Sequence, residues 1–383
     1  MAEVRKPISL YIHIPFCIRK CYYCDFCSEA GTRDRMENYI RMLIREMDLW
    51  KEKLDAYFIR SVFIGGGTPS VVPLHLMEKL FNQLHAAFHI LPSCEISIES
   101  NPGTLDEEKL RTYIHFGVNR LSIGLQAWQD HILKQLGRIH KQAQFLQSYE
   151  LARKAGFENV NVDLMFGLPG QRFSDWKETL FEVVRLHPEH ISAYGLTIED
   201  DTLFGKWYRK GLLALPSEEE ERRMYHFAID YLVRNGYQHY EISNFSVRGK
   251  ECLHNRNYWE NGEYIGLGLA AHSYFQGVRF ANAEEFETYF MDIRQNRLPI
   301  VHRQENTLQD EISETLFLGL RLIQGINRAK FRERFGFDPV QKYAEKIKKL
   351  EGQKLLEIDP YTIRLTRKGL DVSNQVFIEF LPD

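Results

Sequence analysis

The sequence has no apolar run that approaches the roughly 20 residues needed to span a bilayer. It also has no large excess of one charge, because 49 Lys and Arg stand against 52 Asp and Glu. The first absence predicts a chain without membrane-spanning helices, and the second argues against a dedicated nucleic-acid surface. Residues 1–7 lead into a short mixed stretch with no small-residue cleavage site, which predicts no signal peptide and a cytoplasmic location.

Cysteine is scarce, with six in 383 residues, yet four of the six fall between Cys17 and Cys27. Scattered cysteines in a short secreted chain would indicate a disulfide framework, whereas a tight cluster in a long chain favours a metal. A zinc site usually needs two separated ligand pairs, and no distant C-x2-C is present. Cys17, Cys21 and Cys24, at the spacing C-x3-C-x2-C, better fit three ligands of a 4Fe–4S cluster that leaves one iron open.

The first 200 residues alternate between short β-branched runs and longer segments of helical periodicity. The predicted strands are residues 8–14, 61–64, 95–99, 120–125, 159–165 and 190–197. The predicted helices between them are residues 36–54, 74–88, 107–116, 142–154 and 176–185. Six β-α units in succession imply an α/β fold with a parallel sheet, enough for most of a TIM-type (β/α) barrel.

Unusual residues follow these strands at their carboxyl ends. The cysteine loop follows the first strand, and a glycine loop at residues 65–69 follows the second. Glu99 and Gln126 end the third and fourth strands, and Asp163 lies late in the fifth. Because the active sites of (β/α) barrels collect at the carboxyl ends of strands, these five segments are predicted to serve one site.

Each of these features also has a plainer explanation. The glycine loop lacks the Walker lysine and the G-x-G-x-x-G spacing, and by itself it equally fits a tight strand-to-helix turn. Glu99 is well placed to accept hydrogen bonds from a pair of ribose hydroxyls, or to form an ion pair at a strand end. Gln126 and Asp163 equally fit ordinary buried hydrogen bonds.

The character of the chain changes after residue 298. Residues 206–235 are predicted to be helical and charged, and the glycine-rich segments that follow to pack beside the barrel as strands and loops. The C-terminal pattern is two amphipathic helices followed by strand, strand and helix, at residues 308–323, 341–350, 355–358, 362–365 and 366–373. The predicted division is a barrel at residues 1–235, a flanking segment at 236–300, and a small helical or winged-helix-like domain at 301–383.

Several longer motifs accompany these features. They are Tyr-Ile-His-Ile-Pro-Phe-Cys, Cys-Tyr-Tyr-Cys-Asp-Phe, Gly-Gly-Gly-Thr-Pro-Ser, Ser-Ile-Glu-Ser-Asn-Pro, Leu-Ser-Ile-Gly-Leu-Gln, Leu-Gly-Arg-Ile-His and Val-Asp-Leu-Met-Phe-Gly-Leu-Pro. Together they resemble the radical S-adenosylmethionine (SAM) superfamily, and within it the family that includes oxygen-independent coproporphyrinogen III oxidase. The resemblance extends over nearly the whole chain and implies a partial (β/α)6 barrel of the radical SAM type.

By this resemblance, Cys17, Cys21 and Cys24 hold a 4Fe–4S cluster whose open iron binds SAM. The residues implied around the cluster and SAM are Tyr11, Tyr23, Gly66, Gly67, Thr68, Glu99, Gln126, Arg138 and Asp163. The implied chemistry is one-electron reduction of SAM to methionine and a 5′-deoxyadenosyl radical, with the barrel orienting the cofactor and excluding water. Cys27 as a fourth ligand would close the open iron, so we expect it to lie near the cluster without binding it.

Two functions compete within the family. The oxidase decarboxylates propionate side chains of coproporphyrinogen III, whereas related haem chaperones bind haem and pass it to apo-haemoproteins of respiratory chains. The chaperone is favoured by the 16 residues before Cys17, fewer than the oxidase carries, and by His254-Asn-Arg-Asn-Tyr258-Trp259, which matches their H-N-x-x-Y-W motif. The resemblance makes His254 an axial haem ligand, with Tyr258 and Trp259 covering the macrocycle.

The haem assignment has alternatives of its own. A histidine beside aromatic residues is more often a core or surface residue, and no C-x-x-C-H attachment motif is present. Cys252 is a lesser candidate, as a thiolate ligand, and Cys94 fits a small core residue.

A third interpretation is a cluster protein that binds or senses without SAM turnover, against which the glycine loop and Glu99 count. The leading interpretation is a haem chaperone whose partners are haem and apo-haemoprotein acceptors, with no nucleic acid. It leaves open whether SAM is cleaved, whether the protein is a homodimer, and whether it contacts membrane respiratory proteins peripherally.

Overall fold

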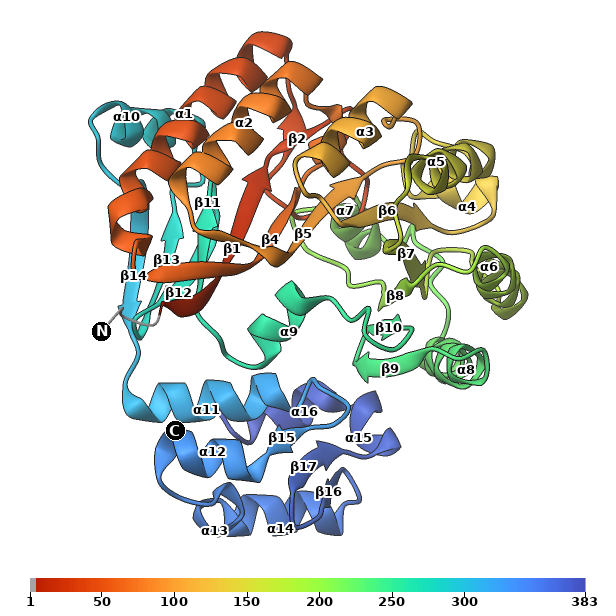
Figure 1. Ribbon diagram of the computed structural model, residues 1–383. Coiled ribbons are helices and arrows are strands. Elements are labelled where there is room, and N and C mark those ends of the chain that lie inside the picture. Colours follow the sequence, from red (N-terminus) through yellow and green to blue (C-terminus); the bar gives the residue numbers. More distant parts are fainter. Residues whose placement is uncertain (1–4, 383) are drawn as a thin grey trace.

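The computed structural model describes residues 5–382. Figure 1 shows a curved sheet with helices on its outer face, above a smaller C-terminal unit. Residues 1–4 lie outside the described part of the chain. The prediction that the N-terminal segment is not a signal peptide begins on these residues. Within residues 5–382, no helix combines the length and apolar character needed to cross a membrane.

Six parallel strands form the centre of the sheet, adjacent in chain order. They are β1 (Lys6–Ile14), β4 (Tyr57–Gly66), β5 (Ile90–Ser100), β6 (Arg120–Gln126), β7 (Val160–Phe166) and β8 (His190–Gly195). All six predicted strands are therefore confirmed. Most of their residues are buried, because helices cover the outer face and the inner face encloses the barrel interior.

The five predicted helices are also confirmed. They are α1 (Arg33–Lys51), which continues into η1 (Glu52–Leu54), α2 (Leu74–Ala87), α3 (Glu107–His115), α5 (Gln142–Ala155) and α6 (Phe173–Arg185). Side-chain caps fix two of the starts, since Thr32 and Asp106 each accept a hydrogen bond from the backbone N–H three residues on. The short α4 (Asp130–Gln135) was not predicted, because six residues are too few to show a helical period.

The segment predicted to be helical over residues 206–235 forms two helices, α7 (Leu203–Arg209) and α8 (Glu218–Arg234). Gly211 lies at φ +67° just after α7, and Pro216 stands just before the Ser217 cap of α8. A left-handed glycine and a proline both end helical periodicity, so the predicted stretch is interrupted.

Further strands extend the sheet at both edges. β10 (Asn244–Ser246) pairs antiparallel with β8 and is followed by β9 (Gln238–Glu241). At the other edge β11 (Tyr264–Leu267) runs parallel to β1, followed by the antiparallel strands β12 (His272–Phe275), β13 (Val278–Asn282) and β14 (Ile300–Glu305). The segments predicted to pack beside the barrel thus belong to the same 12-stranded sheet. Strands this short show too little alternation to reveal their pairing from sequence.

The C-terminal unit has its own core, which includes Leu316, Phe331, Ile363 and Phe380. Its helices are α11 (Leu308–Gly319), α12 (Arg328–Phe335), α13 (Pro339–Lys342), α14 (Ala344–Gly352), α15 (Arg367–Asp371) and α16 (Ser373–Ile378). A three-stranded antiparallel sheet joins β15 (Ile326–Asn327), β17 (Thr362–Leu365) and β16 (Leu356–Ile358). The predicted order of strand, strand and helix is confirmed by β16, β17 and α15.

Backbone pairing holds the C-terminal unit against the barrel. Glu241 at the end of β9 forms a β-bridge with Leu322, just after α11. Ile323 N donates to Tyr240 O at 3.0 Å, and Ile242 N donates to Arg321 O at 3.1 Å. The β9 edge of the large sheet is therefore covered. Figure 1 shows α9 (Leu253–Trp259) lying between the sheet and this unit.

Candidate functional site

The cysteine loop is anchored at both ends. β2 (Phe16–Cys17) pairs in parallel with β3 (Glu29–Ala30), which closes the loop between them. Tyr22 N donates to Leu136 O at 3.0 Å, and Arg19 Nη2 donates to Gly137 O at 2.6 Å. The loop is therefore held against the segment that follows α4, at the carboxyl ends of the central strands.

The predicted cluster ligands are free, half-buried thiols with polar neighbours. Cys17 Sγ lies 3.5 Å from Thr68 Oγ1, and Arg138 Nη1 donates to Cys21 Sγ over 3.5 Å. Burial raises the pKa of Cys24 to about 11. The Thr68 hydroxyl and the Arg138 guanidinium suit a cluster held by negative thiolates, because both can donate hydrogen bonds to sulfur.

The same loop does not have the geometry of a site for one ion. Among residues 5–382, no group of three His, Cys, Asp or Glu side chains could hold a single metal ion. Thiolates on one zinc ion all lie about 2.3 Å from it, whereas each thiolate of a cubane binds a different iron. The prediction of a cluster over a single ion therefore rests on the C-x3-C-x2-C spacing of the three thiols.

Cys27 has different neighbours. Its Sγ lies 3.9 Å from Glu284 O, and its backbone carbonyl pairs with His13 Nε2 at 2.8 Å. The other ring nitrogen of His13 pairs with Tyr11 OH at 2.9 Å. His13 thus ties the end of the cysteine loop to β1. The alternation of Ser9, Tyr11 and His13 with apolar residues was the signal that could have identified it.

The glycine loop lies against Glu99. Gly66 N donates to Glu99 Oε2 at 3.1 Å, and Gly66 has φ +105°. A Cβ at Gly65 would lie 2.7 Å from Glu99 Oε2, and one at Gly67 would lie 2.7 Å from Phe16 O. Gly67 requires glycine because the atoms around it are backbone atoms that cannot move aside, whereas a side chain at Gly65 would displace the Glu99 carboxylate. Burial, together with the nearby carboxylate of Asp163, raises the pKa of Glu99 to about 8.

A hydrogen-bonded chain connects the loops after three different strands. Asn101 Nδ2 donates to Thr68 Oγ1 at 2.7 Å. Arg138 Nη2 donates to Asn101 Oδ1 at 2.5 Å and to Gly124 O at 2.6 Å. Thr68 and Arg138, both predicted site residues, are therefore linked through Asn101. Asn101 was not predicted, although it lies in the Ser-Asn-Pro motif after the third strand.

Gln126 and Asp163 lie where β6 and β7 approach the mouth of the barrel. Gln126 has φ +71°, a left-handed conformation that is costly for any residue but glycine and is concentrated at functional sites. Asp163 accepts hydrogen bonds from Ser122 Oγ at 2.6 Å and Asn161 Nδ2 at 2.8 Å. Asp163 therefore forms the ordinary buried hydrogen bonds that were the alternative to a role in the site. Its carboxylate is also close enough to Glu99 to raise the pKa of that residue.

The two predicted tyrosines come from different segments, Tyr11 from β1 and Tyr23 from the cysteine loop. Tyr11 stacks on Phe63, with ring centroids 6.4 Å apart, and Tyr23 packs near Phe204 at the same separation. Burial raises the pKa of both phenols well above its ordinary value. The structure thus brings the cysteine loop, the glycine loop, Glu99 and Arg138 together, while the roles of these residues as ligands stay predictions.

His254 and Tyr258 are one turn apart on the face of α9 that points into the barrel. His254 Nε2 pairs with Tyr258 OH at 2.8 Å, and His254 Nδ1 pairs with Ser61 Oγ at 3.1 Å. The His254 side chain is 1% exposed, and burial lowers its pKa to about 3. The imidazole is therefore neutral, and both ring nitrogens are already hydrogen-bonded, so a haem iron could reach it only after these bonds opened.

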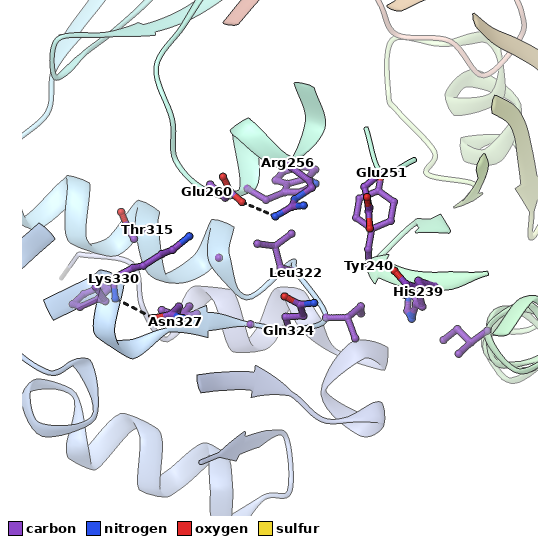
Figure 2. Close-up of a pocket in the computed structure, with 18 of the residues that line it drawn as sticks. His239, Tyr240, Glu251, Arg256, Glu260, Thr315, Leu322, Gln324, Asn327 and Lys330 are labelled. Atoms are coloured by element: carbon purple, nitrogen blue, oxygen red, sulfur yellow. Dashed lines mark hydrogen bonds and ion pairs between the residues drawn. The ribbon is translucent and has the colours of Figure 1, made fainter. Parts of the chain in front are cut away.

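Trp259 lies on the other face of α9. With Arg256 and Glu260 it lines a pocket of about 890 Å³ between the barrel and the C-terminal unit, drawn in Figure 2. The structure thus brings His254 and Tyr258 together but separates Trp259 from them. The Arg321 guanidinium lies 4.3 Å from the centre of the Trp259 ring, an arrangement typical of a cation–π contact.

The start of α9 is held by Glu95 of β5, a residue that was not predicted. Its carboxylate accepts hydrogen bonds from Leu253 N and His254 N, each at 3.1 Å. Cys252 Sγ donates to the same carboxylate over 3.6 Å, and burial raises the pKa of Cys252 to about 12. A protonated, buried thiol is a poor haem ligand. Cys94 is 3% exposed, which confirms that it is a core residue.

Comparison with known proteins covers almost the whole chain. The Radical SAM superfamily model matches residues 11–183, and the HemN C-terminal domain model matches residues 306–372. The chain is 38% identical to "Heme chaperone HemW" of Lactococcus lactis over 99% of both chains. It is 36% identical to the Bacillus subtilis protein of that name, over 97% of this chain and 99% of the relative.

The fold has a counterpart among solved structures. The structure of coproporphyrinogen III oxidase (HemN) from Escherichia coli superposes with a TM-score of 0.87, covering 99% of this chain and 91% of the other. The two sequences are 22% identical, so this likeness establishes the fold, a radical SAM partial barrel with a C-terminal domain.

Proposed function

The chain belongs to the HemW haem chaperone family of the radical SAM superfamily, and on that premise we propose that it binds haem and passes it to apo-haemoproteins. The observation that carries the proposal is the full-length identity to relatives named as haem chaperones, C-terminal domain included. The proposed partners are haem and apo-haemoprotein acceptors, in the cytoplasm or among membrane respiratory proteins that this chain contacts peripherally. A homodimer belongs to the same proposal.

The proposed cofactors are a 4Fe–4S cluster on Cys17, Cys21 and Cys24, and SAM beside the glycine loop and Glu99. When bound, the cluster supplies the electron that reduces SAM. The protein's own part is to bind and to orient. The carboxyl of Glu99, with its pKa raised to about 8, is protonated at neutral pH and can donate as well as accept a hydrogen bond at a ribose.

Arg138 supports the assignment of the cluster. It is a buried cation, and the pKa of its guanidinium is raised by the nearby Tyr23 and by Cys21, to which it also donates a hydrogen bond. A fixed positive charge beside three thiolates offsets their mutual repulsion, since hydrogen bonds and charge around sulfur tune a cluster. Its bonds to Asn101 and Gly124 hold the guanidinium in place.

Coproporphyrinogen III oxidation is the second candidate function, and it is supported by the contact between Glu99 and the glycine loop, the segments that the resemblance assigns to SAM. The test supplies anaerobically reconstituted protein with SAM and coproporphyrinogen III, and looks for protoporphyrinogen. A haem chaperone should bind haem and should form no protoporphyrinogen in this assay. Clear turnover would establish the oxidase instead, whereas cluster-bearing protein that neither binds haem nor turns over would favour a sensing role.

A further inference from the structure

The helix α9 separates two spaces in the molecule. His254 and Tyr258 face the barrel, whereas Arg256 and Trp259 line the pocket between α9 and β9 on one side and α11, β15 and α12 on the other. The volume of this pocket is about 890 Å³. Ligand pockets range over roughly 300–1,000 Å³, so this one has room for a ligand larger than most small metabolites.

Much of the pocket wall is apolar. Trp259 comes from α9, Phe331 from α12, and Leu322 and Ile323 from the segment that bridges the two units. These residues would desolvate a broad apolar surface, and the indole of Trp259 favours a flat one. The apolar residues come from both units, so such a ligand would contact barrel and C-terminal unit together.

Charge is distributed unevenly around the pocket. Figure 2 shows Lys330 and Thr315 on one side, and Glu251 and His239 on the other. Across residues 5–382, the Lys330 ammonium has no ion pair or side-chain hydrogen bond, while Arg256 Nη2 lies 3.0 Å from Glu260 Oε1. An apolar ligand with acidic groups along one edge matches this distribution, because the unpaired ammonium can accept a carboxylate without breaking another pair.

We propose that this interdomain pocket binds haem, with its propionate edge beside Lys330 and its macrocycle against Trp259. The inference rests on the proposed function for the class of ligand and adds the place where it binds. His254 faces away from this pocket and both its ring nitrogens are engaged, so haem is held here without that imidazole. A haem held by contact and charge is easier to release to an acceptor than one held by a strong axial bond.

The test titrates hemin and hemin dimethyl ester, whose propionates are blocked, into cluster-reconstituted full-length protein without SAM. Lys330→Met should weaken hemin binding about threefold to fivefold, and Lys330→Glu about tenfold, as expected for a partly exposed ion pair. Neither change should alter binding of the ester. Lys348→Met is the matched control, because Lys348 is an exposed lysine on α14 of the same unit and lies outside the pocket. Trp259→Phe should reduce the quenching of tryptophan fluorescence by bound hemin.

The outcomes separate the two proposals. Wild-type protein that binds no hemin contradicts the proposed function, and the pocket assignment falls with it. A second outcome is that wild-type protein binds hemin, that both Lys330 variants and Trp259→Phe bind it equally well, and that His254→Ala does not bind it. This outcome would support the proposed function and contradict the assignment of haem to the interdomain pocket. If Lys330→Met weakens the binding of hemin and of its ester equally, the pocket assignment is also contradicted, because Lys330 would then not recognise the propionates.

Discussion

His254 Nε2 and Tyr258 OH share a 2.8 Å hydrogen bond inside the barrel, within a motif whose residues suggest a haem ligand. The bond spans one turn of α9, and Ser61 occupies the other ring nitrogen at 3.1 Å. The first role of this pair in the structure is therefore to fix α9 against β4, and any role in haem ligation needs that contact to open.

Tyr258→Phe should destabilise the protein. The substitution keeps the ring and removes the hydroxyl, so the buried His254 Nε2 loses its partner. An unsatisfied buried polar group costs about 1–3 kcal/mol, and we expect the free energy of unfolding in urea to fall by that amount. Tyr361→Phe is the control, since Tyr361 is 76% exposed and should change nothing. Equal stability of Tyr258→Phe and wild type would show that the bond does not form.

Cys17→Ala, Cys21→Ala and Cys24→Ala should each abolish the iron and sulfide content of reconstituted protein, together with its visible absorbance. Cys27→Ser should keep both, because Cys27 Sγ points toward Glu284 O and its carbonyl is held by His13. A full complement of iron in any of the three alanine variants would refute that ligand. Loss of the cluster in Cys27→Ser would mean that the set of ligands must be redrawn.

Glu95→Gln should loosen α9. The two carboxylate oxygens accept separately from Leu253 N and His254 N, and the amide of Gln keeps one accepting oxygen but replaces the other with an NH2 group that cannot accept. A charged acceptor at a helix start also interacts favourably with the helix dipole. Together these effects predict a loss of about 1–3 kcal/mol in the free energy of unfolding. Glu108→Gln, at an exposed position in the first turn of α3, is the control and should cost under about 0.5 kcal/mol.

The pKa of Glu99 makes stability depend on pH. Its folded-state pKa of about 8 lies above the ordinary 4.5, so the folded protein retains a proton that the unfolded chain has lost. The contribution of Glu99 to the free energy of unfolding should therefore fall as pH rises from about 4.5 to about 8, by at most about 1.4 kcal/mol per pH unit.

Glu99→Gln should remove the upper part of this dependence in cluster-free protein. Glu46, with its pKa raised by burial to about 7, contributes a change of the same sign and remains in the variant. Urea unfolding at a series of pH values between 5 and 9 measures both. An unchanged slope between pH 7 and 8 in Glu99→Gln would show that Glu99 is ionised in the folded protein.

Much of the fold could be predicted because its signals are local. The strands that end at Gly66 and Gln126 are apolar runs with turn residues behind them, and their helices have full periodicity. Short elements could not be predicted, since α4 and α9 are too brief to show a period and β9 to β14 depend on pairing with distant strands.

The site could be predicted where it followed strand ends, and not where it depended on distant contacts. Glu95, His13 and Asn101 act through hydrogen bonds to residues 14 to 159 positions away, which no local pattern reports. The separation of His254 from Trp259 follows from helical geometry, because five positions at about 100° each place them roughly 140° apart. The six-residue motif is too short to show a helical period, so the sequence does not predict this separation.

Haem transfer tests the proposed function most directly. Reconstituted protein is loaded with haem, freed of excess, and mixed with the apo-form of a b-type haemoprotein while the absorbance spectrum of each is followed. We expect the acceptor to gain its holo-protein spectrum as this protein loses its haem. An acceptor that stays in its apo-form, while haem remains on this protein or never binds to it, would contradict the assignment as a haem chaperone.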